Sequence, residues 1–523
     1  MADPLLATLG AAPFTIDDLE ALASSAARLA LSEEARAAVA ASRRVVERYA
    51  AGEEPVYGLN TGLGANLDYR VEPAALASFQ EQLVRGRAIG AGEPLPERVC
   101  RAALIARCIG LARGGAGISP GVLDLLLAMV ERGVTPVVPR RGSIGAGDLG
   151  LCAHIGLVAV GRGEAWYDGD RLAGDAALAA AGLHPVKLGP KDGHALCSSS
   201  AVTTGYAAVT LVDTARLVLF AVYAAALADE GFAANLAIFD SRIASLRGAA
   251  REEEAATLFH RLLEGSSLFD GSPRRLQDPL SFRCLAQVVG VVLQALGDAR
   301  REVELEIAAV GDSPVVLLPH GEMLSTASFH TPAVALAFDS LAIACAHLAG
   351  SCFQRICRLM EPELTDLPRY LSPVGGGSAG YVPVQKLAAA LLGEIRLLAT
   401  PASLDAMPVS DAVEDVAPQT PLAISKVADL LEPLRILVAV EALVAAQAVD
   451  LRAGARLAPP TRRLHEAVRS VVAPLEADRE PAPDVERVVS LAADPSLLED
   501  LAGSLVGLDL PFLPRISAVA GTP

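Results

Sequence analysis

Aromatic residues are scarce in this sequence. Phe, Trp and Tyr together make up 4% of the 523 residues, and there is one tryptophan. A core must therefore be built from small and branched aliphatic side chains, which is typical of a large helical protein. Cysteine patterning is also missing, because none of the eight cysteines forms a Cys-X-X-Cys pair. Their apolar neighbours indicate buried thiols in a reducing environment, and we expect no metal site.

The sequence has fewer basic than acidic residues. The 44 Lys and Arg residues face 61 Asp and Glu residues, which gives a formal net charge of −17 and a pI near 5.0. A nucleic-acid or anionic-membrane partner is therefore not expected. Residues 1–10 lack a basic stretch followed by an apolar core. No apolar run has the character of a membrane span of about 20 residues, and we expect a cytoplasmic protein.

Aliphatic residues are abundant instead. Hydrophobic residues reach 52% and the mean hydropathy is +0.40, which favours long helices buried on several sides, as in an oligomer with a helical core. We predict a mainly α fold, in which a long-helix bundle joins a smaller N-terminal region with a glycine-rich loop and minor β-hairpin content. The predicted parts are the N-terminal region 1–204, the bundle 205–472 and shorter peripheral helices in 473–523.

The longest alanine- and leucine-rich runs are predicted as bundle helices. They cover residues 210–230, 285–305, 332–359, 384–400 and 425–452. Pro433 should start or kink a helix within the last run. Nearer the N-terminus, helices are predicted over 18–29 and 32–52. Turn residues and adjacent aromatics in 161–172 predict a small hairpin.

The glycine-rich loop is the first candidate for chemistry. Residues 142–149 read Gly-Ser-Ile-Gly-Ala-Gly-Asp-Leu and precede an apolar helical stretch. Three glycines leave a permissive backbone at a helix N-terminus, which suits either a tight turn or a site. The loop resembles the signature loop of the histidine and aromatic amino acid ammonia-lyases, Gly-Ser-Val-Gly-Ala-Ser-Gly-Asp-Leu.

In that family the Ala-Ser-Gly triad cyclises and dehydrates into the electrophile methylidene-imidazolone. This sequence has Gly145, Ala146, Gly147 and Asp148, without the serine and one residue shorter. The resemblance therefore implies the short-loop branch of the superfamily, which includes ergothionase. We expect no cofactor, because the residue that supplies the electrophile is absent.

Two further motifs carry the resemblance. Residues 57–64 are similar to the family's Tyr-Gly-Val-Asn-Thr-Gly-Phe-Gly, which implies Tyr57 as the base that removes the β-proton and Asn60 as a substrate contact. Residues 277–284 resemble Gln-Asp-Pro-Tyr-Ser-Leu-Arg-Cys, which implies that Arg283 binds the substrate carboxylate. Leu280 stands where the family has a second tyrosine. Without the resemblance, Tyr57 would be a packing residue and Arg283 a partner in an intersubunit salt bridge.

Residues that differ from the family add candidates. Residues 188–200 match a stretch in which Ser198 replaces the asparagine that holds the electrophile and substrate, and His194 replaces an apolar residue. Arg87 takes the place of a histidine and could contact a carboxylate. A structural histidine and an exposed arginine are the alternatives for these last two residues.

The remaining motifs concern the substrate's ring. The resemblance implies that Phe329 lines the pocket and that Glu414, in Val-Glu-Asp, faces a basic heterocycle such as imidazole. Lys386 stands where the family has an uncharged residue and would place a cation near the ring or the base. A lysine on an amphipathic helix surface is the other interpretation.

We interpret the sequence as a carbon–nitrogen lyase that acts on an imidazole-bearing amino acid or betaine such as ergothioneine. Its catalytic residues would be Tyr57, Lys386 and Glu414. A quaternary ammonium departs as neutral trimethylamine, so such a substrate needs no electrophile. The resemblance also implies a homotetramer with active sites shared between subunits. Two alternatives remain: an ammonia-lyase acting on histidine or a related aromatic amino acid, and a non-catalytic relative that binds such a ligand.

Overall fold

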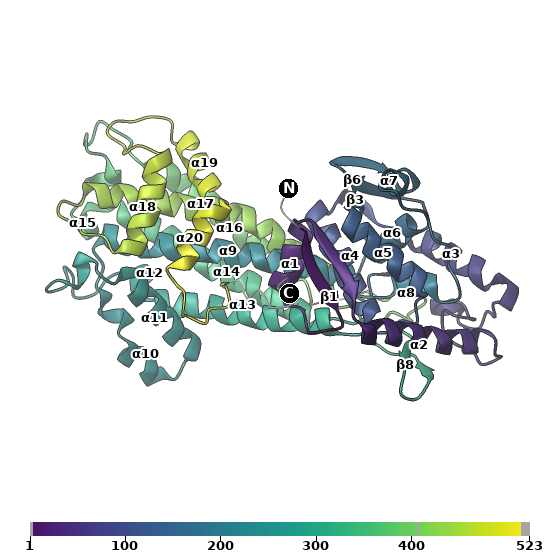
Figure 1. Cartoon of the computed structure of the whole chain (residues 1–523). Helices are drawn as coiled ribbons and strands as arrows, with labels where there is room; N and C mark the ends of the chain where they lie inside the picture. Colours follow the sequence, from purple (N-terminus) through teal and green to yellow (C-terminus); the bar gives the residue numbers. More distant parts are fainter. Residues whose placement is uncertain (1–3, 405–406, 514–523) are drawn as a thin grey trace.

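Long helices dominate the structure, a computed structural model that describes residues 4–404 and 407–513. This confirms the mainly α prediction. Figure 1 shows an elongated body: α2, α3 and α5–α8 lie at one end with β3, β6 and β8, α10–α12 lie at the other, and long helices run between them. The bundle helices are α9 (Ala201–Phe232), α13 (Leu285–Ala308), α14 (Pro332–Leu359), α16 (Val382–Leu398) and α17 (Thr420–Leu451).

Shorter helices complete both ends. Those of the first half are α1 (Ile16–Ser24), α2 (Glu33–Ala50), α3 (Leu76–Arg87), α4 (Glu97–Ala112), α5 (Pro120–Arg132), α6 (Leu149–Ala159), α7 (Gly174–Ala180) and α8 (Asp192–Cys197). Those of the second half are α10 (Ser241–Arg247), α11 (Ala250–Leu263), α12 (Leu280–Arg283), α15 (Pro362–Thr365), α18 (Pro459–Val471), α19 (Pro481–Leu491) and α20 (Pro495–Gly503). Short 3-10 turns include η3 (Leu236–Phe239) and η4 (Ser267–Phe269).

Helix α9 is the axis of the core. It packs mainly between α4 and α17, and nearly all of its residues are buried. A helix that is apolar on all sides belongs inside a protein, where several neighbours cover it. At Gly205 the backbones of α9 and α4 lie close together, because a Cβ on this residue would lie 2.4 Å from the backbone nitrogen of Ala103 on α4.

The sheets are small and peripheral. β1 (Leu5–Leu9) pairs in parallel with β2 (Ala27–Leu31), and β8 (Val315–Leu317) pairs antiparallel with β9 (Glu322–Leu324). The predicted hairpin is confirmed as β6 (Glu164–Tyr167) and β7 (Asp170–Ala173), which join β4 (Thr135–Pro136) in a three-stranded sheet. β3 (Ala91–Pro94) pairs with β5 (Pro139–Arg141), and this pair leads directly into the glycine-rich loop.

One local prediction is wrong, and a second is wrong in one of its two alternatives. The helix predicted over 18–29 ends at Ser24, because residues 27–31 pair with β1 and the apolar pattern there serves a strand. Helix α17 runs without interruption through Pro433, which is buried inside it and does not start a helix. Packing on several sides keeps the α17 segment helical despite the hydrogen bond that proline removes.

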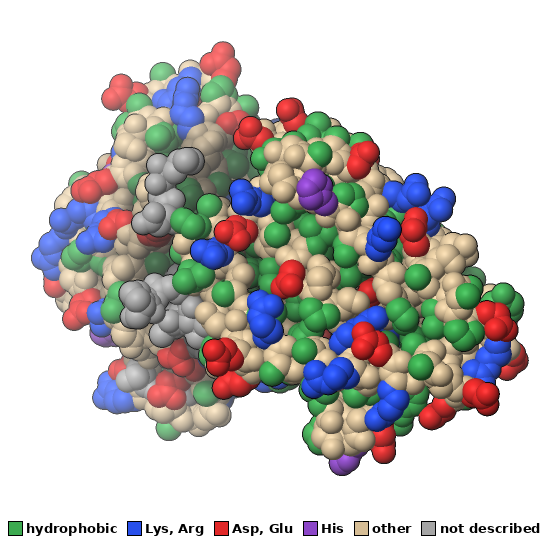
Figure 2. Space-filling model, turned by 45° about the vertical axis from the view of Figure 1, so that its right-hand side comes forward, with side chains coloured by type: hydrophobic (Ala, Val, Ile, Leu, Met, Phe, Trp, Pro, Cys, Tyr) green, Lys and Arg blue, Asp and Glu red, His purple; other side chains and the backbone are tan. Residues whose placement is uncertain are grey.

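Two helical stretches, 192–232 and 332–359, are long and apolar enough to cross a membrane by composition alone. In the folded chain 89% of the apolar window of the first stretch and 61% of that of the second are buried. Core helices of a globular protein have this character. On the face drawn in Figure 2, acidic and basic side chains are interspersed without a continuous basic area.

Candidate active site

The loop that carries Tyr57 is fixed by its own side chains. The Asn60 amide accepts from the Val56 N–H at 2.8 Å and donates to the Glu54 carbonyl at 2.8 Å. The Gly64 N–H donates to the phenolic oxygen of Tyr57 at 2.8 Å, so the loop closes on its own tyrosine. Gly58 and Gly64 have φ of +65° and +60°, values that glycine adopts without steric cost.

The glycine-rich loop is anchored by Asp148. One carboxylate oxygen of Asp148 accepts from the Ser143 hydroxyl at 2.8 Å and the Thr203 hydroxyl at 2.8 Å; the other accepts from the Thr203 N–H at 2.7 Å. Burial raises the pKa of Asp148, against the lowering effect of these hydrogen bonds. The carboxylate thus ties the start of α6 to the first turn of α9.

Distant segments close over the same loop. Ala146 forms an antiparallel β-bridge with His330, and the Gln419 N–H donates to the Ile144 carbonyl at 2.9 Å. A Cβ on Gly147, whose φ is +71°, would lie 3.4 Å from the Phe329 ring. Phe329 and the segment before α17 therefore both contact the glycine-rich loop.

The segment that carries Glu414 makes a tight turn. Ser410, Asp411 and Ala412 have φ of +55°, +54° and +62°, which is a costly conformation for residues other than glycine. Residues 409 and 414 pair across this turn, and the Ser410 hydroxyl donates to the Glu414 carboxylate at 3.1 Å. The turn presents a half-buried carboxylate to the glycine-rich loop.

Helix α8 supplies the opposite wall. Its His194 is 2% exposed, and its ring lies edge-on to that of Tyr57, with 5.8 Å between centroids and 63° between planes. Burial, with Lys191, Arg87 and Arg107 nearby, lowers the pKa of His194 to about 3, so the imidazole is neutral at pH 7. Burial also lowers the pKa of Lys191 to about 8, and its ammonium donates to the Ala116 carbonyl at 2.6 Å.

These walls enclose a cavity of about 500 Å³. Eight of the residues predicted from the sequence line it: Tyr57, Arg87, Ala146, Gly147, His194, Ser198, Phe329 and Glu414. Among the described residues, Arg87 is the one lysine or arginine in the lining. A phenol, a neutral imidazole and a carboxylate around one space can bind a small polar ring and move a proton.

The sequence missed other lining residues: Leu63, Gly64, Gly86, Ile89, Gly142, Ser143, Ile144, Leu149, Gly150, Ser313, Val409, Ser410 and Val413. Six of them lie inside the motifs 57–64 and 142–149, and Val413 directly precedes Glu414, so the motifs themselves were a usable signal. Ser313 follows no motif and reaches the cavity through the fold alone.

Six predicted residues do not line the cavity. Asn60 holds the Tyr57 loop, and Gly145 and Asp148 support the glycine-rich loop from outside the lining. Arg283, Leu280 and Lys386 belong to α12 and α16. Leu280 and Lys386 are exposed, and Arg283 donates to the Gln277 side chain at 3.1 Å. In Figure 1, α12 lies at one end of the molecule, and α6 and α8 lie at the other.

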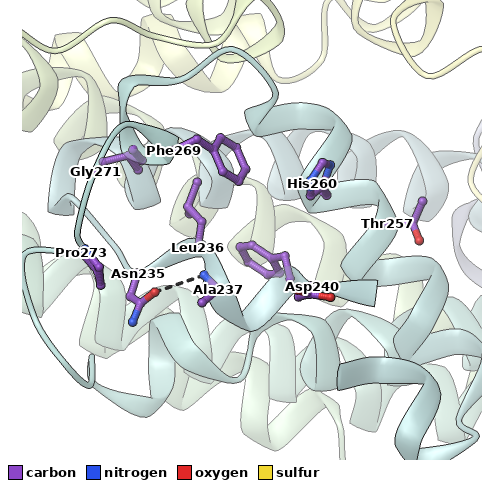
Figure 3. A pocket seen from close by; sticks show the side chains of 11 residues that line it. Asn235, Leu236, Ala237, Asp240, Thr257, His260, Phe269, Gly271 and Pro273 are labelled. Carbon is purple, nitrogen blue, oxygen red and sulfur yellow. Dashed lines mark hydrogen bonds between the residues drawn. The ribbon is translucent and has the colours of Figure 1, made fainter. Parts of the chain in front are cut away.

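A second cavity of about 560 Å³ lies beside η3 and α11. Figure 3 shows residues 235–240 on one side of it and Phe269 with His260 on the other. It is larger than the Tyr57 cavity, but none of the predicted residues lines it. Arg242 holds the pKa of Asp240 at about 2, so this carboxylate is ionised and already paired. The chemistry is therefore assigned to the Tyr57 cavity.

Comparisons with known proteins agree on one family. Residues 14–470 match the family described as aromatic amino acid lyase. A histidine ammonia-lyase from Symbiobacterium thermophilum is 38% identical over 94% of this chain and 98% of its own, and one from Anaeromyxobacter sp. is 39% identical over 92% and 97%. Ergothionase from Treponema denticola, solved with desmethyl-ergothioneine sulfonic acid, has a TM-score of 0.91 at 30% identity and covers 94% of this chain and 99% of its own.

A solved histidine ammonia-lyase from Trypanosoma cruzi is similar too, with a TM-score of 0.89 at 27% identity over 99% of this chain and 98% of its own.

These relatives correct the prediction that the chain has no cofactor. Histidine ammonia-lyases 38% and 39% identical over more than nine-tenths of the chain imply the methylidene-imidazolone electrophile of that family. The residues of the loop do not fit the group. Gly145, Ala146 and Gly147 contain no hydroxyl to dehydrate, and the Ser143 hydroxyl is held by Asp148 and the Gly145 N–H. No step of the reaction is therefore assigned to it.

Proposed function

The chain belongs to the aromatic amino acid lyase family, and on this premise we propose that it eliminates an amine, with trimethylamine favoured, from an imidazole-bearing amino acid or betaine such as ergothioneine. The product is the conjugated acrylate. The observation that carries the proposal is the gathering of Tyr57, His194 and Glu414 around one cavity.

Tyr57 is the base in this reaction. Its oxygen takes the proton from the β-carbon of the substrate, and the electron pair of that C–H bond forms the double bond between the α- and β-carbons. The bond from the α-carbon to nitrogen breaks, and its electrons leave with the amine. The Gly64 N–H lies 2.8 Å from the phenolic oxygen. Its hydrogen bond can also be donated to a phenolate and would stabilise that form.

Trimethylamine is favoured because of the leaving group. A quaternary trimethylammonium departs as a neutral amine and needs no prior protonation or attachment. A heteroaromatic ring on the β-carbon stabilises the negative charge that develops when the proton is removed. Ergothioneine and the trimethylbetaine of histidine combine both properties, and the ergothionase of Treponema denticola shares the fold and 30% of the residues.

Recognition of the ring falls to Glu414. A carboxylate accepts the N–H of an imidazole or thioimidazole, and the Ser410 hydroxyl 3.1 Å away holds it in place. His194 and Ser198 form the wall near Tyr57 and Phe329 the wall beside Gly147. Among the lining residues that the structure describes, Arg87 is the one cation, and it can meet the substrate carboxylate.

Other protomers complete the site in our proposal. Arg283 would bind the carboxylate from a neighbouring chain, with Leu280 beside it, and Lys386 would reach the ring or the base. Exposed Leu280 and Lys386, and the position of α12 far from α6 and α8, support this arrangement (Figure 1). We infer a homotetramer in the cytoplasm that acts on a small molecule.

An amine-release assay on the purified protein tests the function. L-histidine, histidine trimethylbetaine and ergothioneine are compared, and ammonia, trimethylamine and the acrylate are measured. Trimethylamine from a betaine without ammonia from histidine is the expected result. Ammonia from L-histidine would favour the second candidate, a histidine ammonia-lyase, which the 38% and 39% identical relatives support.

The role of Tyr57 is tested in the same assay. Tyr57→Phe should keep substrate affinity but lower kcat by about 100- to 10,000-fold, because the proton acceptor is removed. Tyr69→Phe is the matched control, since Tyr69 is 67% exposed outside the cavity. A Tyr57→Phe variant with the kcat of the control would remove Tyr57 as the base.

A further inference from the structure

Gln80 connects two walls of the active site without lining it. This α3 residue is fully buried, and its side-chain amide makes two hydrogen bonds to backbone groups. Its nitrogen donates to the Gly58 carbonyl at 3.0 Å, next to Tyr57, and its oxygen accepts from the His194 N–H at 2.9 Å. The amide therefore joins the Tyr57 loop to α8.

Close packing around two glycines makes this connection tight. A Cβ on Gly58 would lie 2.1 Å from Nδ1 of His194, and a Cβ on Gly193 would lie 2.2 Å from the Gln80 carbonyl oxygen. Both glycines are thus required where the loop, α3 and α8 meet. His194 occupies the third position of α8, where its N–H has no partner inside the helix. Gln80 supplies the acceptor that this N–H needs.

We propose that Gln80 is a positioning residue, which sets Tyr57 against His194 and so places the base over the β-carbon of the substrate. The inference rests on the proposed function for its kinetic consequence, and on the two hydrogen bonds for its structural one. Of the common side chains, an amide of this length provides an acceptor for His194 and a donor for Gly58 at every pH. Ionised glutamate provides the acceptor only, and leucine provides neither.

Three variants separate these roles. Q80L should lower kcat for amine release by about 10- to 100-fold with a much smaller change in KM, because a displaced base impairs the transition state more than substrate binding. Q82L is the matched control, since Gln82 is exposed on the same helix. It should keep the kcat of the unmodified enzyme.

Q80E gives a readout that a merely structural residue would not. When the carboxyl group of the new glutamate is protonated, it can still donate to the Gly58 carbonyl. When it is ionised, it has no hydrogen to donate. The kcat of Q80E, divided by that of the unmodified enzyme, should therefore fall as pH rises. A constant ratio across pH, or a Q80L kcat equal to that of Q82L, would overturn the proposal.

Hydrogen exchange tests the positioning role independently of activity. In Q80L, amide exchange should rise in residues 56–64 and 192–197. In Q80E at high pH it should rise in 56–64 alone, because the His194 N–H keeps its acceptor. Unchanged exchange in 56–64 in both variants would overturn the role of Gln80. Failure of every substrate with the unmodified enzyme would instead overturn the proposed function, and exchange would then decide on Gln80.

Discussion

His194 is a neutral imidazole surrounded by cations. Lys191, Arg87 and Arg107 all disfavour its protonation, and its Nδ1 is buried without a hydrogen-bond partner. A histidine at this place cannot serve as a cationic contact at neutral pH. It is instead a neutral polar residue in the cavity wall. The orientation of its ring relative to Tyr57 depends on Gly58 and Gln80.

The depressed pKa of His194 predicts a loss of stability in acid. Its pKa falls from 6.5 in an unfolded chain to about 3 in the folded one, so below pH 6.5 the unfolded chain binds a proton that the folded chain does not. Stability present above pH 6.5 is lost as pH falls towards 3, by about 1.4 kcal/mol per pH unit at the limiting slope.

Thermal melts between pH 6.5 and 5 check this slope. The Tm of the unmodified protein should fall faster than that of His194→Leu, which has no group to titrate there. The expected difference is about 2 kcal/mol at pH 5. Parallel curves of Tm against pH would contradict a buried neutral imidazole. Comparing slopes removes any constant effect of the substitution itself.

At this scale the sequence named eight of the residues that line the cavity and left thirteen others unnamed. Motifs identified Tyr57, Phe329 and Glu414 because each resembles a family segment, and the structure brings them to one space. The sequence did not identify Gln80, because a glutamine on a helix has no signal until the fold buries its amide between two backbones. Ser313 was missed for the same reason.

Among the elements, α4 and α9 cross at a glycine. The three atoms nearest to a methyl group on Gly205 would all be backbone atoms of α4, the nearest at 2.4 Å, and backbone cannot move aside as a flexible side chain can. The crossing lies just after Thr203, which holds Asp148 of the glycine-rich loop. The contact between α4 and α9 therefore lies next to the hydrogen bonds that hold the glycine-rich loop.

Gly205→Ala should therefore destabilise the protein by about 1–3 kcal/mol or more, through overpacking. Gly121→Ala is the control: Gly121 lies in α5 with no heavy atom within 4 Å of an added Cβ, and should change stability by less than about 0.5 kcal/mol. The Tm of both variants measures the difference. Equal Tm values would mean that α4 and α9 are not in tight backbone contact.

Long helices were predictable because each segment is rich in alanine and leucine over many residues. The strand β2 was not, because its five residues adjoin a helical pattern and pair with a partner near the N-terminus. Local pattern cannot show a long-range pairing, and α17 shows the converse, since its packing overrides the proline inside it.

For the whole molecule, the separation of Tyr57 from Arg283 predicts complementation between subunits. Tyr57→Phe and Arg283→Met should each have strongly reduced amine release alone. Co-expressed with different affinity tags, they should form mixed assemblies that regain amine release, because in the proposed homotetramer an intact site draws Tyr57 from one chain and Arg283 from another. The kcat of doubly purified mixed assemblies is the measurement, and absence of recovery would mean that one chain supplies both residues.

The wide spacing of the cavity's walls along the chain also affects synthesis. Tyr57 and Glu414 are 357 residues apart (414 − 57), so a ribosome needs roughly 20 to 70 s to make the second after the first. For much of that interval the nascent chain carries α9 with α4 on one side and nothing yet on the side that α17 will cover. Exposed apolar surface on an incomplete chain favours aggregation, so we expect chaperones to bind the chain during this interval. We therefore expect the growing chain to need this protection until α17 is complete at Leu451.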